Sequence, residues 1–152
     1  MTGEENMLKL VEADVPATDY RLDEQVGFLL RRAHQRHVAI FAAAIPDLTP
    51  PQFAALAKLG EQGDCSQNQL GQSIAMDAAT IKGVIDRLKA RGLVSLSPHD
   101  GDKRRVMVSL TGEGRAALAT LRAKALGIST ETLSPLSAKD AETFVRLLAK
   151  LG

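Results

Sequence analysis

The stretch SQNQLGQSIAMDAATIKGVIDRLKARGLVSLSPHDGDKRRVMVSLT, residues 66–111, decides the fold of this 152-residue chain. It predicts a short helix, a tight connection, a longer helix and then a basic hairpin. Ser66 and Gln69 have the spacing of a capping box at the start of the short helix. Asp77 can cap the longer helix, and Gly92 should end it. This order is typical of a helix-turn-helix with a wing beside it.

The hairpin is expected from a change of period after Gly92. Residues 93–97 and 106–110 alternate as short strands do, and the segment 99–105, HDGDKRR, is rich in turn residues. A two-stranded wing with a basic tip follows from this pattern.

Helices are expected on both sides of this segment. An apolar stripe runs from about Asp19 to Ala44, and Thr49 begins the next helix with prolines at its first positions. Further helices should begin after Thr111 and after Ser137, the latter opening the third capping-box pattern. The predicted fold is mainly α: a winged helix-turn-helix of about six helices plus a two-stranded β wing.

The net charge of +1 is unevenly distributed. Residues 1–25 hold seven acids against two bases, whereas residues 77–105 hold seven bases against four acids. A basic segment in a near-neutral protein indicates local contact with a polyanion. Cys65 is the single cysteine, and neither a signal peptide nor a membrane-spanning run is recognisable, so we expect a cytoplasmic protein with no membrane partner.

The longer helix carries the first candidate DNA contacts. Small residues at its start permit close approach to base edges, and longer basic side chains follow on later turns. The wing tip would reach phosphates or the minor groove. The candidate DNA-binding residues are Gln67, Asn68, Ala78, Ala79, Thr80, Lys82, Arg87, Asp102, Lys103, Arg104 and Arg105.

The chain resembles the MarR family of transcriptional regulators over roughly residues 20–150. The resemblance is carried by LTPPQF at 48–53, QLG at 69–71, TIKGVIDRLKARGLV at 80–94 and the wing DGDKRRVMVSLT at 100–111. It implies a homodimer on a pseudo-palindromic operator, with residues 47–111 as the DNA-binding domain. Residues 19–46 and 112–152 would be dimerisation helices, preceded by a flexible acidic segment at 1–18.

The family's wing motif Asp-x-Arg falls on Asp102 and Arg104. Arg104 would enter the minor groove, and Asp102 would hold its guanidinium. Two positions depart from the family pattern: Ala78 and Gly83 stand where longer polar side chains are common, so base preference does not carry over.

An effector site is predicted on the first helix. His37 interrupts the apolar stripe, His34 flanks it and Arg31 lies one turn earlier, which is the make-up of a pocket for a small amphipathic acid. The resemblance to regulators of aromatic-acid catabolism makes a small aromatic carboxylate the first ligand to test. Histidines with satisfied hydrogen bonds in a dimer interface are the alternative.

Other functions have weaker support. GEGRAA at 112–117 matches a dinucleotide motif, but no second parallel strand follows. His34 and His37 have a spacing that suits a metal, without a Cys-His cluster beside them. Cys65 precedes a helix start, although a plain thiol is the simpler interpretation. We therefore expect no enzyme, no cofactor and no metal, and the alternative function is a winged-helix module that binds proteins without binding DNA.

Overall fold

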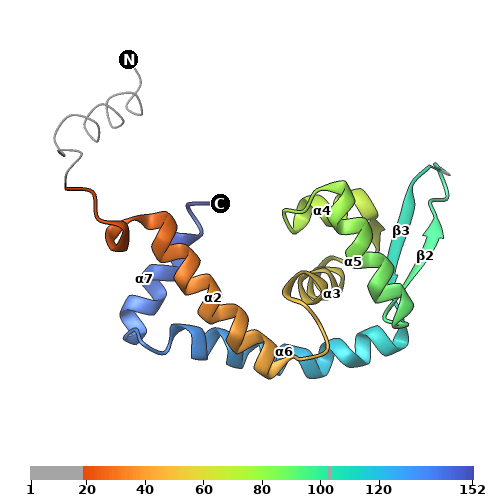
Figure 1. Cartoon of the computed structure of the whole chain (residues 1–152). Coiled ribbons are helices and arrows are strands. Elements are labelled where there is room, and N and C mark those ends of the chain that lie inside the picture. The colour runs from red at the N-terminus through yellow and green to blue at the C-terminus, as the bar shows by residue number, and fades with distance from the viewer. Residues whose placement is uncertain (1–18, 103) are drawn as a thin grey trace, which may run out of the picture. The chain divides into compact units, whose positions relative to one another are not determined.

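The computed structural model describes residues 19–102 and 104–152 (Figure 1). The acidic segment 1–18 and Lys103 lie outside the described residues. The chain divides into two compact units, residues 1–36 and residues 37–152. No helix of the described part is both long and apolar enough to cross a membrane.

The first unit holds a short 3-10 turn, Leu22–Glu24, and the beginning of helix α2, Val26–Ala44. The predicted start of the first helix at Asp19 was wrong. Gln25 has extended backbone angles, φ −85° and ψ 135°, which separate the turn from the helix. The predicted end at Ala44 is confirmed.

The second unit contains the end of α2 and all later elements, and the described residues are mainly helical, as predicted. Six α-helices, α2 to α7, and three strands follow one another along the described chain. After α2 these elements are α3 Pro50–Gln62, β1 Cys65–Ser66, α4 Gln67–Ser73, α5 Ala78–Ala90, β2 Val94–Pro98, β3 Val106–Leu110, α6 Gly112–Leu133 and α7 Ala138–Leu148.

Caps place the helix starts where the sequence predicts them. The Thr49 and Ser66 hydroxyls each accept the backbone N–H three residues later, and the glutamine there accepts the N–H of the cap in return. At the starts of α5 and α6, the Asp77 and Thr111 side chains accept the backbone N–H three residues later, without a side-chain bond back to the N–H of the cap. Ser137 also accepts only the N–H of Asp140, so one of the two hydrogen bonds of the predicted third capping box forms.

The sheet has three strands rather than the predicted two. Its order is β1-β3-β2, and both pairings are antiparallel. Cys65 lies opposite Val108, and Leu96 is paired with Val108 from the other side. The additional strand ties the start of α4 to the base of the wing.

The core of the second unit lies between α3, α4, α5, the sheet and α6. Its completely buried members are Ala55, Leu56, Leu70, Ile81, Ile85, Leu88 and Val108. Figure 1 shows α3, α4 and α5 gathered together, with the β2–β3 hairpin projecting beside α5 and α6 starting at the hairpin's base. This arrangement leaves one side of α5 and the described residues of the hairpin tip exposed.

Candidate nucleic-acid interface

The helix-turn-helix is made by a close approach of α4 to α5. A Cβ on Gly71 would lie 3.1 Å from the Ile81 side chain and 3.1 Å from the Met76 carbonyl, so glycine suits this position. Ala75 turns the chain with φ 56°, and the Met76 N–H donates to the Gly71 carbonyl at 2.8 Å. The two helices are therefore fixed to each other by backbone as well as by side chains.

Helix α5 has a buried side and an exposed side. Ile81, Val84, Ile85 and Leu88 are buried in the core. The exposed side presents small residues at the N-terminus and cations further along: Ala78, Ala79, Thr80, Lys82, Arg87, Lys89 and Arg91. A helix with this division can enter a major groove without losing its packing.

Lys82 is paired within its own helix. Its Nζ lies 2.9 Å from Oδ2 of Asp86, and both side chains are more than half exposed. An exposed pair of this kind contributes about 0.3–0.5 kcal/mol. Lys82 can therefore exchange Asp86 for a phosphate at little cost.

Asp77 caps the candidate recognition helix with a charge. Its Oδ1 accepts the Thr80 N–H at 2.7 Å. Hydrogen bonds from the backbone and the side chain of Thr80 lower the pKa of the Asp77 carboxyl below its ordinary value. The cap is therefore anionic at neutral pH and fixes the first turn of α5.

The wing brings Asp102, Arg104 and Arg105 together on an exposed tip. The expected contact between the Asp102 carboxylate and the Arg104 guanidinium is not the one that the structure shows. Its Oδ1 accepts the backbone N–H of Arg104 at 3.0 Å, and its Oδ2 lies 3.9 Å from Nε of Arg105. The carboxylate thus shapes the turn, and the Arg104 side chain is exposed.

Gln67 and Asn68 occupy the first turn of α4. Gln67 is half-buried and Asn68 is exposed. Their neighbours Ser66 and Gln69 are occupied with the capping box. Asn68 is the freer of the two to contact a partner.

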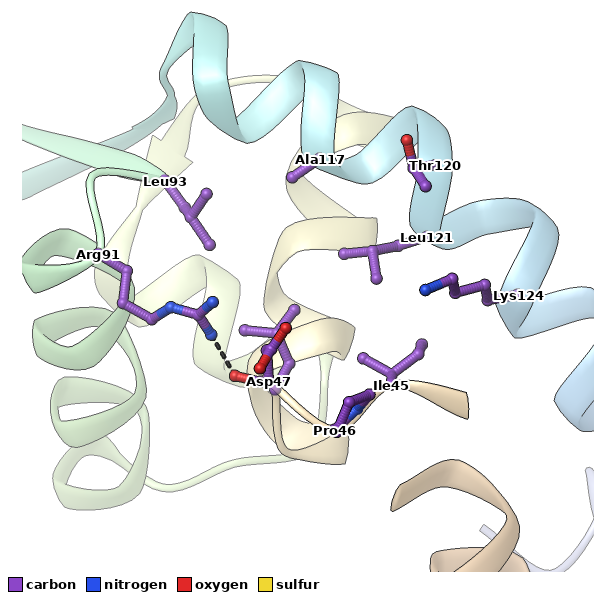
Figure 2. Close-up of a pocket in the computed structure, with 10 residues that line it drawn as sticks. Ile45, Pro46, Asp47, Arg91, Leu93, Ala117, Thr120, Leu121 and Lys124 are labelled. Carbon is purple, nitrogen blue, oxygen red and sulfur yellow. Dashed lines mark hydrogen bonds between the residues drawn. The ribbon is translucent and has the colours of Figure 1, made fainter. Parts of the chain in front are cut away.

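The recognition helix is also attached at its other end. Arg91, the residue that caps α5, donates through Nη1 to the Asp47 carbonyl in the loop between α2 and α3 (Figure 2). Beside this bond lies a cavity of about 310 Å³, with Leu93, Leu121 and Ile45 on its apolar side and Lys124 at its edge. No local sequence pattern predicts this link, because its two residues are 44 positions apart.

A second cavity, of about 250 Å³, includes the predicted effector residue His37. Its other lining residues come from α2, α3 and α6: Phe41, Pro50, Phe53, Ala125, Ile128 and Ser129. Nδ1 of His37 lies 2.9 Å from the Thr132 hydroxyl, which leaves Nε2 for a ligand. Polar atoms from Ser129 and His37 thus stand in a largely apolar wall.

The other two predicted effector residues, Arg31 and His34, belong to the first unit and do not line this cavity. Both are exposed on α2. Arg31 lies over the ring of Phe28, 5.7 Å from its centroid, in cation–π geometry.

The weaker sequence motifs have structural explanations. Gly114 must be glycine because a Cβ there would lie 2.0 Å from the Leu93 carbonyl oxygen, and the strand before it is antiparallel, unlike that of a dinucleotide fold. Cys65 is buried, and its sulfur accepts from Gln62 at 3.2 Å. Within the described residues no group of three or more His, Cys, Asp or Glu side chains is placed to hold a metal ion.

Comparisons with known proteins agree with this geometry. The family model described as "MarR family" matches residues 48–106. The transcriptional repressor NicR of Pseudomonas putida is 45% identical over 91% of this chain and 89% of its own length.

Two solved structures are also similar. A probable transcriptional regulator from Pseudomonas aeruginosa is 53% identical, with a TM-score of 0.85 over 87% of this chain and all of that one. BpsR from Bordetella bronchiseptica, whose DNA binding is regulated by 6-hydroxynicotinic acid, is 45% identical, with a TM-score of 0.83 over 87% of this chain and 96% of that one.

Proposed function

Because this chain belongs to the MarR family of transcriptional regulators, we propose that it represses transcription as a homodimer bound to a pseudo-palindromic operator and is released by a small aromatic carboxylate. The observation that carries this function is the pairing of an exposed, cation-bearing face on α5 with a basic hairpin tip beside it. No catalytic step is part of the proposal, and the regulator would work in the cytoplasm.

In this proposal α5 reads the major groove. Ala78, Ala79 and Thr80 approach base edges and thymine methyl groups, since their side chains are short and exposed. Lys82 and Arg87 contact phosphates, as do Gln67 and Asn68 from α4. Arg104 enters the minor groove, with Arg105 and the undescribed Lys103 at the flanking phosphates.

An exposed apolar stripe supports the homodimer. Phe144, Leu147, Leu148 and Leu151 recur at three- and four-residue steps, and each is at least 41% exposed in the single chain. A soluble protein rarely leaves such a stripe in water, and a twofold dimer covers it with its own copy. In the first unit Val26, Leu29 and Leu30 are exposed in the same way.

The cavity beside His37 supports an aromatic effector. A cavity of roughly 150 Å³ already accommodates benzene, so a ring with polar substituents suits this one. A ligand oxygen could bond Nε2 of His37, while Phe41 and Phe53, whose rings are 6.1 Å apart, pack on the ring. The 6-hydroxynicotinic acid that regulates BpsR belongs to this chemical class. Arg31 and His34 remain predicted ligand-binding residues.

The deciding experiment titrates the protein into DNA from the region upstream of its own gene, at several salt concentrations, and measures the affinity. Direct phosphate contact predicts a steep loss of affinity with salt, whereas the alternative, a protein-interaction module, predicts no specific binding and a shallow slope. Addition of 6-hydroxynicotinic acid or benzoate should weaken binding about 100-fold, which requires about 2.7 kcal/mol of coupling.

A variant then tests the effector site. His37→Ala should abolish release by the acid and leave affinity for DNA without the acid nearly unchanged. If this variant is released as well as the parent, the cavity does not hold the effector. If the variant instead binds DNA weakly throughout, His37 serves the dimer interface.

A further inference from the structure

His99 begins the loop that forms the wing tip, directly after β2. The side chain is half-buried, whereas the described residues that follow it in the loop are all exposed. It is one of three histidines in the chain and has no part in the function proposed so far.

The imidazole accepts two backbone hydrogen bonds at a single atom. Nδ1 of His99 lies 3.0 Å from the Gly101 nitrogen and 3.2 Å from the Asp102 nitrogen. Both partners are N–H donors, so Nδ1 must present its lone pair and the ring proton must sit on Nε2. Asn and Asp side chains commonly make this kind of bond to the backbone two residues on, and here a histidine makes it.

The bonds that begin at His99 continue through the loop and return to it. Asp102, held through its N–H, accepts the backbone N–H of Arg104 at Oδ1, and its carbonyl accepts the N–H of Arg105 at 3.0 Å. The carbonyl of Arg105 in turn accepts the N–H of His99 at 3.1 Å. The backbone of both wing arginines is therefore connected to the imidazole by two consecutive hydrogen bonds.

We propose that His99 is a positioning residue for DNA binding: by accepting two backbone hydrogen bonds at Nδ1, its ring orders the wing tip so that Arg104 projects toward the minor groove and Arg105 toward the flanking phosphates. This proposal rests on the proposed function, since it assumes that the wing contacts DNA. Ordering the loop before binding lowers the conformational entropy that binding must otherwise remove. His99 itself does not contact DNA.

The variants that test this differ in whether they keep an acceptor at the Nδ1 position. The amide of Asn can place an oxygen where Nδ1 lies, whereas the longer Gln side chain mimics Nε2 and Ala mimics neither. His99→Ala and His99→Gln should each weaken operator affinity about 5- to 20-fold, and His99→Asn should restore it to within about twofold of the parent. Gly101→Ala is the control, because the added Cβ would sit at an ordinary 3.4 Å from the ring and the N–H is kept.

Nuclear magnetic resonance of the full-length protein provides a readout that needs no DNA. The ring nitrogens of His99 should report the tautomer protonated at Nε2, and the amides of Gly101 and Asp102 should lose protection from exchange in His99→Ala and keep it in His99→Asn. Equal DNA affinity in His99→Ala and the parent would overturn the proposal, as would failure of His99→Asn to rescue.

Arg104→Ala separates this result from failure of the proposed function. If Arg104→Ala also leaves affinity unchanged, the wing does not contact DNA, and the minor-groove contact in the proposed function is wrong. If Arg104→Ala weakens binding and His99→Ala does not, the wing contact stands and only the positioning role of His99 is wrong.

Discussion

Helices α5 and α7 are of similar length, 13 and 11 residues, yet they relate to the rest of their chain in opposite ways. Helix α5 buries four apolar side chains and leaves its small and basic residues outside. Helix α7 is the more strongly amphipathic by sequence, and none of its residues is buried. One chain thus completes the packing around α5 by itself, whereas the apolar face of α7 stays exposed in the single chain and is covered only in the proposed homodimer.

The largest expected effect comes from placing charge on that face. Phe144→Glu combined with Leu148→Glu should prevent dimerisation at micromolar concentration, because two carboxylates would have to be buried in an apolar interface. Operator affinity should fall at least about 100-fold, since half of the phosphate contacts leave with the partner. Sedimentation should show 16.2 kDa instead of twice that mass.

The control places two glutamates away from the stripe; because they replace lysines, the net charge changes even more than in the test variant. Lys139→Glu combined with Lys150→Glu should stay dimeric. A dimer that survives the charges at Phe144 and Leu148 would contradict the contrast between the two helices.

The next effect tests the self-sufficiency of α5. Ile85→Ala removes a completely buried side chain and should lower the free energy of unfolding by about 2–5 kcal/mol. Lys89→Ala, exposed on the same helix, should change it by less than about 0.5 kcal/mol. Urea denaturation at fixed protein concentration measures both, and similar values for the two variants would count against a core centred on α5.

A smaller effect is expected at the wing. Arg104→Ala should weaken operator binding about tenfold and reduce the salt slope by about two units, because the proposed homodimer loses one cationic side chain at each of its two wings. Asp102→Ala should have part of this effect through the turn that it holds. Lys58→Ala removes an equal charge from α3 and should leave both quantities nearly unchanged. An unaltered slope in Arg104→Ala would remove the wing from the interface.

The smallest effect concerns the cap of α5. Since the pKa of Asp77 is lowered in the folded protein, its contribution to stability is present above the unfolded-state pKa of about 3.9 and is lost as pH falls through the folded value. Asp77→Asn keeps an acceptor and removes the titration, so its stability should vary less between pH 5 and pH 2 in urea titrations. Identical pH profiles for parent and variant would show that the carboxylate is not stabilised by the helix start.

The sequence predicted what local chemistry determines. The caps at Thr49, Ser66 and Asp77 use bonds that span three residues, and the corresponding helices begin where expected. The alternation before and after the wing tip located β2 and β3 to within one residue. Local hydrogen bonding and periodicity are properties of a short window, so a sequence contains them directly.

Features made by distant residues were not predictable. Strand β1 exists because Cys65 and Ser66 meet β3 some forty residues later, and two residues are too few to show a period. The bond between His37 and Thr132 spans 95 positions. In the wing, the Asp102 carboxylate could reach either arginine, and only the conformation of the turn decides that it bonds the backbone of Arg104.

Helix α6 has a mechanical consequence. It is an unbroken rod of 22 residues, about 33 Å long at 1.5 Å per residue. One end is pinned under the hairpin, where Gly114 lies against the Leu93 carbonyl, and the His37 cavity is lined near the other end by Ile128 and Ser129. Gly114 and Ser129 are about 22 Å apart along the helix, so a tilt of α6 by about 8° around its cavity end moves its hairpin end by about 3 Å, close to the 3.4 Å rise between successive base pairs. A ligand the size of one ring could therefore displace the surface formed by α5 and the hairpin by about one base step, without bending α5 or the hairpin strands.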